Sequence, residues 1–400
     1  MTDDLMKSSG SGDADNSTHA DEQRLYPKVR FRGFDEPWKK VKARQLFISK
    51  SKKNYPALPV LSASQELGMI YRSNLDSDIK TERSGLKNYK LIEPGDFVIH
   101  LRSFQGGFAY SDKRGIASPA YTVFTFKDKT NHDDYFWKEK FQTYNFIQLL
   151  KQVTYGIRDG KSISYSDFST LKLTYTSKKE QVQISKCLKQ INSLLSLQQR
   201  KLELESLLYK HLKRNCFYNN YNFYYSKPKK LNIKMKDIIT LEDNQRIPVS
   251  ENNRKKGITP YYGANGIQDY VDGYTHVGQY ILIAEDGASD IQNYPVIAVN
   301  GKVWINNHAH VLKVNKTVDF SYLLYFLKNF NYFPWLVGSG RFKLNAKTLL
   351  NIKISIDSNT ENQRKIGVLL NECDSLTHAT STRIKLIKDI KQFLLQNLFI

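Results

Sequence analysis

Two long segments that lack helix-breaking residues limit most strongly what this chain can fold into. Residues 180–217 and 361–400 contain no proline and only one glycine, Gly367. In the first segment, apolar residues such as Ile184 and Leu188 recur every three or four positions, which is the period of an amphipathic helix. About 40 residues make a helix roughly 60 Å long, which is longer than one globular domain needs. We therefore expect each long helix to pair with a second helix.

The two segments are related to each other. Each begins with Ser-x-x-Glu, at residues 177–180 and 358–361, which predicts a capping box at both helix starts. An offset of 182 residues superposes nine apolar positions, which include Leu194/Leu376, Leu204/Leu386 and Leu208/Ile390. Upstream of the helices, a one-residue slip aligns two strand-like runs. The repetition indicates an internal duplication, in which a variable domain is followed by a long helix twice over.

Pairing of the two helices would bury their apolar stripes against each other. The stripes could instead anchor each helix on its own domain, and the sequence leaves this alternative open. The residues that we predict to make the helix pairing are Ile184, Leu188, Ile191, Leu195, Leu202, Leu208 and Leu212 in the first segment, and Ile366, Leu370, Cys373, Ile384, Ile390 and Leu394 in the second.

The remaining sequence divides around the helices. Residues 1–22 are polar and acidic, which predicts a disordered tail. Residues 23–177 and 218–360 alternate strand-like runs with turn signals, which is typical of mixed α/β (α+β) domains. With spacer helices at 178–217 and 361–400, we predict two domains joined by two long antiparallel helices and related by a pseudo-twofold axis.

The charge favours a polyanionic partner. Sixty Lys and Arg against 39 Asp and Glu give a net charge of +21. Because residues 1–22 hold six acids against Lys7, a local −5, the rest of the chain carries +26. Nucleic acid is the simplest partner for such a charge, although a generally lysine-rich composition is the alternative. Three dispersed cysteines argue against disulfides and fit a reducing cytoplasm, and no run is apolar enough to predict a membrane span.

Motifs expected of an enzyme that acts on nucleic acid are missing from the sequence. A methyltransferase would carry an Asn/Asp-Pro-Pro-aromatic loop, and the chain has no Pro-Pro dipeptide. An ATPase would carry a Gly-x4-Gly-Lys-Ser/Thr loop, which is also absent. His308 and His310 could share one strand face as metal ligands do, but without an evident third ligand we favour packing or hydrogen bonding. We expect no catalytic residue, metal or cofactor in this chain.

Residues suited to DNA contacts occur in loop-like segments of both domains. Arg and Lys bind phosphates or guanine, and Asn and Gln suit adenine. We favour four cations as phosphate contacts, because they follow Gly156 and Gly338 at corresponding places in the repeat: Arg158, Lys161, Arg341 and Lys343. Each could equally be an ordinary solvated cation, and the tyrosines could pack in a core or turn. The other candidates are Arg102, Gln105, Lys113, Arg114, Arg254, Lys255, Tyr261, Tyr262 and Asn265.

A series of short motifs, in order along the chain, accompanies the two capped helices. They are Pro27-Lys-Val-Arg-Phe-Arg-Gly-Phe34 followed by Trp38, Leu91-Ile-Glu-Pro-Gly-Asp-Phe97, Thr259-Pro-Tyr-Tyr-Gly-Ala-Asn-Gly266, Tyr280-Ile-Leu-Ile-Ala-Glu-Asp-Gly287 and Asn307-His-Ala-His-Val-Leu312. Together with the repeat, this series resembles the specificity subunits of type I restriction–modification enzymes. The second half has no match to Trp38, so the resemblance does not define its start, near Leu231.

The resemblance implies a non-catalytic subunit that binds double-stranded DNA. Its variable parts would be target-recognition domains that each read half of a bipartite site, and its helices would set the spacer and dock two methyltransferase (modification) subunits. Endonuclease/translocase (restriction) subunits would join the complex, and S-adenosylmethionine, ATP and Mg²⁺ would belong to these partners. The alternative is a stand-alone RNA-binding or structural scaffold with two basic domains on a coiled coil.

Overall fold

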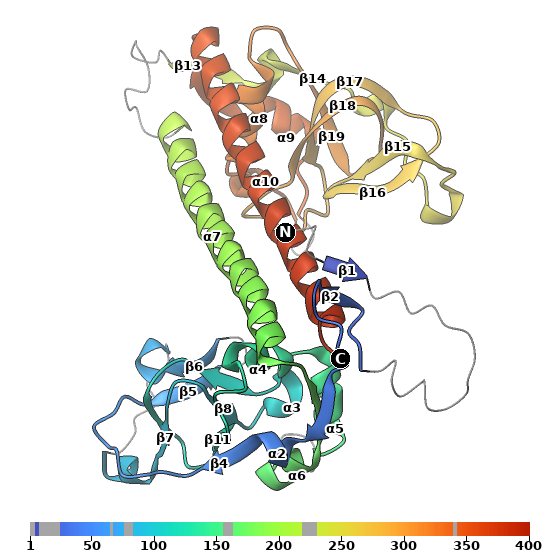
Figure 1. Cartoon of the computed structure of the whole chain (residues 1–400). Coiled ribbons are helices and arrows are strands. Elements are labelled where there is room, and N and C mark those ends of the chain that lie inside the picture. Colours follow the sequence, from blue (N-terminus) through green and yellow to red (C-terminus); the bar gives the residue numbers. More distant parts are fainter. Residues whose placement is uncertain are drawn as a thin grey trace, which may run out of the picture. The chain divides into compact units, whose positions relative to one another are not determined.

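The chain forms two compact units, each completed by parts of both long helices. The structure is a computed structural model that describes residues 5–7, 25–64, 67–75, 83–154, 163–217, 230–338 and 342–400. Unit 1 comprises residues 1–197 and 384–400, and unit 2 comprises residues 198–383. The long helices are α7 (Lys178–Phe217) and α10 (Thr360–Asn397), which appear green and red in Figure 1. Each unit therefore contains part of each long helix.

Unit 1 is built around a four-stranded antiparallel sheet in the order β4-β11-β8-β9. Small two-stranded sheets pair β1 with β2, β3 with β12, β5 with β6 and β7 with β10. The strands are β1 (Leu5–Lys7), β2 (Val29–Phe31), β3 (Lys39–Lys42), β4 (Phe47–Lys50), β5 (Leu61–Ser64), β6 (Gly68–Tyr71), β7 (Lys90–Ile92), β8 (Asp96–Ile99), β9 (Ala109–Ser111), β10 (Gly115–Ala117), β11 (Thr122–Phe126) and β12 (Lys172–Tyr175). The short helices are α2 (Ala43–Leu46), α3 (Ser103–Gly106), α4 (Asp134–Lys140), α5 (Tyr144–Lys151) and α6 (Tyr165–Thr170).

An aromatic cluster fills the core of unit 1. The ring of Phe47 lies 5.2–6.1 Å, centre to centre, from the rings of Phe97, Phe124 and Trp137, and all three contacts are edge to face. Edge-to-face contacts of this kind add to the free energy gained by burying the rings. Strands β4, β8 and β11 thus lie against α4 in the larger core of the domain, and a second cluster that includes Leu61, Ile92 and Val98 lies apart from it.

Unit 2 contains a six-stranded sheet in the order β14-β19-β17-β18-β15-β16. Neighbouring strands are antiparallel except for β15 and β18, which pair in parallel. The strands are β13 (Lys230–Lys234), β14 (Ile239–Leu241), β15 (Lys256–Gly263), β16 (Gly266–Val271), β17 (His276–Ala284), β18 (Val296–Ile305), β19 (Ala309–Val314) and β20 (Lys353–Asp357). Helices α8 (Phe320–Lys328) and α9 (Ala346–Asn351) complete the domain.

The duplicated part of the fold is the junction between each domain and its long helix. Strand β12 pairs with β3 before α7, and strand β20 pairs with β13 before α10. In both junctions a backbone hydrogen bond crosses at the same place, from Ala43 N to Leu171 O (2.8 Å) and from Met235 N to Ile352 O (3.0 Å). The predicted mixed α/β fold with an internal repeat is confirmed. The second domain enters this junction at β13, which includes Leu231.

The predicted capping boxes are only partly present. At the start of α7, the hydroxyl of Ser177 accepts the amide of Glu180 at 3.4 Å, but the Glu180 carboxylate turns away to Arg30. At the start of α10, Asn359 rather than Ser358 supplies the capping oxygen, which accepts the amides of Glu361 and Asn362 at 2.9 and 3.2 Å. The one-residue slip explains this second error. The repeat offset is 182 within the helices, so the residue equivalent to Ser177 is Asn359 and not Ser358.

A buried ion pair secures the start of α7. Arg30 donates two hydrogen bonds of 2.8 Å to the Glu180 carboxylate, from Nε and from Nη2, and a third of 2.7 Å to the backbone oxygen of Glu36. Thr176 also donates its hydroxyl to Glu180. Because both charged groups are almost fully buried, their partners replace water completely. The segment that carries β2 is thereby fixed to the long helix.

The end of α10 closes the core of unit 1. Leu394, Leu398 and Phe399 belong to the same cluster as Ile184 and Leu188 of α7. In unit 2 the roles are exchanged, because Leu212 of α7 joins Ile366 and Leu370 of α10 in the second core. Each helix is therefore anchored on both domains. The sequence left open whether the apolar stripes pair with each other or anchor each helix on its own domain, and the structure combines the two.

Two residues predicted to make the helix pairing are instead exposed, Leu208 and Ile390. The apolar stripe is wider than the surface that each domain covers, so part of it faces solvent in both helices. Ile384 is buried, whereas Ile191, Leu195, Leu202 and Cys373 are half-buried.

Burial also changes the pKa of a lysine near this end of α10. The Lys140 ammonium donates to the Thr174 hydroxyl (2.9 Å) and to the backbone oxygen of Ile400 (2.8 Å), and it lies 5.4 Å from the centre of the Trp38 ring. Loss of solvation lowers the pKa of Lys140 to about 7.

The predicted disorder of residues 1–22 is wrong for one short stretch. Strand β1 pairs antiparallel with β2, with Leu5 opposite Phe31. Composition did not indicate this strand, because the pairing depends on backbone groups that β2 offers. The other residues of the predicted tail lie outside the described residues. Among the described residues, no helix combines the length and hydropathy that crossing a lipid bilayer requires.

The single glycine of α10 should be required for close packing. A Cβ at Gly367 would lie 2.8 Å from both Asp319 Oδ1 and the Tyr322 amide nitrogen, two atoms that already share a 2.8 Å hydrogen bond. Alanine favours a helix by about 1 kcal/mol over glycine, but we expect Gly367→Ala to lower the free energy of unfolding by about 1–3 kcal/mol through overpacking. Urea denaturation of the full chain measures this change.

The matched control is Ser381→Ala, at an exposed position of the same helix. Its effect should stay within about 0.5 kcal/mol. A Gly367→Ala variant that is more stable than the unmodified chain would contradict the close approach.

Candidate nucleic-acid interface

The predicted contacts of the first domain fall into two groups. Arg102 and Gln105 are exposed at α3, which joins the end of β8 to the start of β9. Lys113 and Arg114 lie in the turn after β9, where Arg114 is exposed and Lys113 pairs with Asp112. Strand β9 therefore lies between the two groups in the chain. Arg158 and Lys161, two of the four favoured phosphate contacts, lie outside the described residues.

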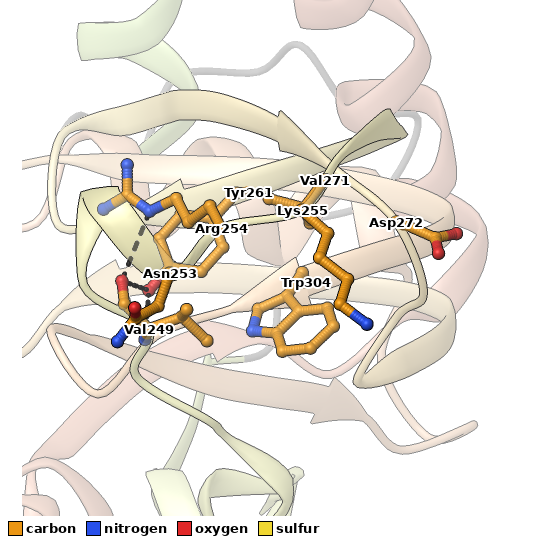
Figure 2. Close-up of a pocket in the computed structure, with 8 residues that line it drawn as sticks. All are labelled: Val249, Asn253, Arg254, Lys255, Tyr261, Val271, Asp272 and Trp304. Atoms are coloured by element: carbon orange, nitrogen blue, oxygen red, sulfur yellow. Dashed lines mark hydrogen bonds between the residues drawn. The ribbon is translucent and has the colours of Figure 1, made fainter.

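In the second domain, Arg254, Lys255 and Tyr261 line one cavity with a volume of about 330 cubic ångströms. Figure 2 shows them with Trp304, whose ring forms one wall. The Arg254 guanidinium lies 4.4 Å from the centre of the Tyr261 ring, and its Nε donates to the backbone oxygen of Val249 at 3.2 Å. These contacts hold the guanidinium against the protein, whereas Lys255 is exposed.

The surroundings of Tyr261 favour the packing alternative over a contact with DNA. Only 1% of Tyr261 is exposed, and its hydroxyl accepts the Val249 amide at 3.0 Å. Trp304, by contrast, was missed by the sequence analysis and presents part of its ring to the cavity. Its indole nitrogen donates to the backbone oxygen of Ile247 at 2.8 Å, which fixes the ring orientation. Nothing in the alternation of β18 distinguishes this tryptophan from a core residue.

The remaining candidates of the second domain lie where β15 ends and β16 begins, or beside β17. The Asn265 amide donates to the backbone oxygen of Gly287 (2.9 Å) and accepts the Ser289 amide (2.8 Å), so it ties two loops together. Tyr262 is half-buried, and burial raises the pKa of its hydroxyl. Lys343 pairs with Glu285 at 3.0 Å. Arg341 lies outside the described residues.

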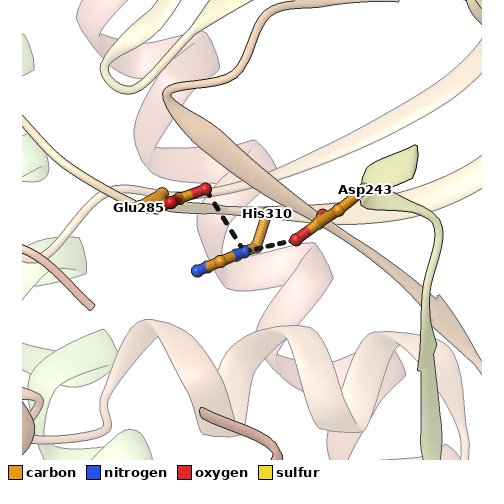
Figure 3. Close-up of side chains that lie close together, drawn as sticks. All are labelled: Asp243, Glu285 and His310. Carbon is orange, nitrogen blue, oxygen red and sulfur yellow. Dashed lines mark hydrogen bonds and ion pairs between the residues drawn. The ribbon is translucent and has the colours of Figure 1, made fainter. Parts of the chain in front are cut away.

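A cluster of ionisable groups lies next to Lys343 (Figure 3). His310 is fully buried, with Nδ1 2.6 Å from Asp243 Oδ2 and Nε2 2.7 Å from the backbone oxygen of Leu344. Arg246 donates to Glu285 at 2.7 Å and to the backbone oxygen of Ala309 at 2.8 Å. The side chains come from the residue that follows β17, from β19 and from the segment after β14, so the cluster joins three parts of the domain.

The cluster places three ligand types of a metal site together, since ligand atoms of Asp243, Glu285 and His310 lie within 4.8 Å of one another. Its charges are already balanced, however, by Arg246 and Lys343. Both ring nitrogens of His310 also lie within hydrogen-bond distance of protein oxygen atoms, so each is already engaged by a protein partner. We therefore interpret the cluster as a structural ion network.

The two carboxylates respond to this network. Burial alone would raise the pKa of Asp243, but the hydrogen bond from His310, the amide of Val311 and the charge of Arg246 together lower it. Burial would likewise raise the pKa of Glu285, and hydrogen bonds from Arg246 and Lys343 lower it instead. His308 does not join His310, because it bonds Asp286 instead. The packing and hydrogen-bonding role expected for the His-x-His pair is therefore what its contacts provide.

Both halves of the chain match one known family. A family profile described as the type I restriction modification DNA specificity domain matches residues 36–206 and again residues 216–389. A Haemophilus influenzae protein named as a type I restriction enzyme specificity subunit is 40% identical over 145 residues, which are 36% of this chain and 37% of that protein. The specificity subunit of the Escherichia coli type I enzyme EcoprrI is 26% identical over 141 residues, 34% of each chain. These alignments span about a third of each relative.

A solved structure shares the fold over nearly the whole chain. The crystal structure of a type I restriction–modification S subunit from M. genitalium superposes with a TM-score of 0.65. The superposition covers 94% of this chain and 99% of the other, at 16% sequence identity. At this identity the similarity establishes the arrangement of elements within the fold and leaves residue roles to other arguments.

Removing Arg246 should weaken the ion network in a pH-dependent way. Arg246→Ala removes the donor that Glu285 and the Ala309 carbonyl share and leaves Glu285 paired with Lys343, so we expect a loss of about 2–4 kcal/mol in the free energy of unfolding at pH 7. A lowered carboxyl pKa contributes stability above its ordinary value of about 4, and this stability is lost as the pH falls through the folded-state value. The difference between the variant and the unmodified chain should therefore shrink below about pH 4.

Urea unfolding between pH 3 and 7 measures this dependence. The control is Arg200→Ala, which removes an exposed ion pair with Glu203 on α7 and should have little effect at any pH. A difference that stays constant down to pH 3 would show that Arg246 stabilises the fold by packing alone.

Proposed function

Because the chain belongs to the type I restriction modification DNA specificity family, we propose that it reads a bipartite double-stranded DNA target, with one half-site for each unit. The duplicated family domain is the observation that carries this proposal, since one copy falls mainly in each unit. A divergent repeat suits two different half-sequences, as a symmetric dimer suits a palindrome. The net charge of +21 supplies the attraction to phosphates that such binding requires.

The exposed cations Arg102, Arg114 and Lys255 are the described candidates best placed to meet phosphates. Arg254, Asn265 and Lys343 instead support the loops that carry them, because their polar groups are engaged by protein partners. We infer that base contacts come from the loop segments around these supports. The alternative of an RNA-binding scaffold is not favoured, since the family match covers both halves of the chain.

We further propose that the chain itself is not catalytic and acts in the cytoplasm. The methyltransferase (modification) and endonuclease/translocase (restriction) subunits would supply the chemistry, with S-adenosylmethionine, ATP and Mg²⁺ bound to them. The sequence lacks the phosphate-binding and base-pocket motifs that these reactions use.

The long helices offer a repeated surface for the methyltransferase subunits. Three pairs of repeat-related residues are 45–59% exposed in both helices, although all are large and apolar: Leu194/Leu376, Leu204/Leu386 and Leu208/Ile390. Exposed apolar residues that recur at equivalent positions indicate a surface that a partner covers. Because the surface occurs twice, we propose that two copies of the same methyltransferase subunit dock there, one on each repeat.

Methylome sequencing tests the function directly. A host that expresses this chain with its methyltransferase partner should carry methylation at one bipartite motif with a fixed spacer, and deletion of this gene should abolish it. The purified chain alone should transfer no methyl group to DNA. Methylation by the isolated chain, or an unchanged motif after the deletion, would refute the proposal.

The docking surfaces can be separated by repeat. Leu204→Lys should weaken one docking site and Leu386→Lys the other, by about 30-fold or more for an apolar anchor, with no loss of folding because both side chains are exposed. Native mass spectrometry should count two partner subunits on the unmodified chain, one on each single variant and none on the double variant.

The control is Ser206→Lys with Ser381→Lys, which adds the same charges at exposed polar positions of the two helices. It should keep both partner subunits. Two bound partners on the Leu204→Lys/Leu386→Lys double variant would place the docking surface elsewhere.

A further inference from the structure

One glutamine occupies the same position in both copies of the repeat. Gln181 and Gln363 are 182 residues apart and lie in the first turn of α7 and α10. Their side chains are 0% and 1% exposed. A buried primary amide needs partners for both its oxygen and its nitrogen, because leaving either one unsatisfied is costly.

The amide of each glutamine makes the same two hydrogen bonds. The Oε1 atom of Gln181 accepts the backbone amide of Asp133 at 2.9 Å, and its Nε2 donates to the backbone oxygen of Thr176 at 2.6 Å. In unit 2, Gln363 accepts the backbone amide of Asp319 at 2.9 Å and donates to the backbone oxygen of Asp357 at 2.6 Å. These equal distances occur in two domains whose sheets differ in strand number and order.

The aspartate that each glutamine holds is the N-cap of a domain helix. Asp133 caps α4 by accepting the Phe136 amide, and Asp319 caps α8 by accepting the Tyr322 amide, both at 2.8 Å. One side chain therefore joins three segments: the long helix, the end of the strand before it, and the N-terminus of a domain helix. The side chain must accept and donate at once, which methionine, glutamate and lysine cannot do in this place.

A second contact occurs one turn further along each long helix, again at an offset of 182. Ser185 donates its hydroxyl to the Asp133 carboxylate. The equivalent residue in α10 is Gly367, and a Cβ there would meet the Asp319 carboxylate at 2.8 Å. Both long helices thus approach the capping aspartate along the same face, so the glutamine is part of a repeated interface.

We propose that Gln181 and Gln363 are positioning residues that fix the angle of each recognition domain on its long helix, and thereby make the complex selective for spacer length. This inference rests on the proposed function. Each glutamine lies where its domain joins the long helix. A small tilt of the domain at that point therefore produces a larger displacement at the DNA-binding surface. A displacement of about 3.4 Å, one base-pair rise, is enough to bring a half-site of the wrong spacer into register.

The test uses the full chain in complex with its methyltransferase partner. Duplexes carry the two half-sites of the natural motif with the natural spacer or with a spacer one base pair shorter or longer. For Gln181→Met, Gln363→Met and the double variant, we expect the ratio of methylation rates between natural and altered spacers to fall by about tenfold, the equivalent of one lost hydrogen bond. The bases required within each half-site should not change.

The matched control is Gln190→Met with Gln392→Met, which makes the same replacements at exposed positions of the same helices. It should keep the spacer selectivity of the unmodified chain. Folded variants at position 181 or 363 that also keep this selectivity would overturn the proposal, since the glutamines would then stabilise the fold without positioning the domains. If the double variant does not fold, the two single variants decide the question.

Hydrogen exchange separates this inference from the proposed function. The amides of Asp133 and Asp319 should be protected in the unmodified chain and should exchange at least about tenfold faster in the corresponding methionine variant. Unchanged protection would overturn the proposal without reference to DNA. A complex that methylates no bipartite site, but whose variants lose this protection, would instead refute the proposed function and the spacer role that rests on it.

Discussion

Each hydrophobic core is shared between a domain and both long helices. The rest of the structure depends on this one interaction. In unit 1, Leu398 and Phe399 belong to the same core as Ile184, although more than 200 residues separate them in the sequence. In unit 2, Leu212 packs with Ile366 in the same way. Burial of such apolar side chains is the main favourable term in folding. Neither half of the sequence can therefore complete its own core without residues from the other half.

This dependence explains why polar contacts are concentrated at the helix starts. The apolar contacts give each helix an attractive surface but little directional preference, because hydrophobic burial is non-directional. Direction comes from buried polar groups with strict geometry: the Arg30–Glu180 pair in unit 1 and the amides of Gln181 and Gln363 in both units. The six-stranded and four-stranded sheets differ from each other, while the hydrogen bonds of the two glutamines are the same in both units. The protein thus repeats the same glutamine contacts at the base of two domains whose sheets differ.

The sequence predicted the frame better than the interface. Helical periodicity and the 182-residue repeat identified α7 and α10, because a 3.6-residue pattern sustained over many turns has no other explanation. Local spacing could not show that Glu180 binds Arg30, 150 residues away, or that Asn359 replaces Ser358 as the cap. It also overestimated burial at Leu208 and Ile390, since periodicity indicates which face is apolar and not what covers it. For the interface, residue type suggested Tyr261, and only the fold shows that Arg254 and Val249 enclose it.

The exchange of helix ends has a consequence for how such a chain can be assembled. Leu212 and Leu394 are repeat-related, yet each lies in the core of the domain that belongs to the other copy of the repeat. Leu212 of the first copy lies in the second core, and Leu394 of the second copy lies in the first core. This is the connectivity of a domain-swapped dimer whose two protomers have become covalently joined. Two identical half-chains, each with one domain and one helix, could fill the same core positions with their own copies of these leucines.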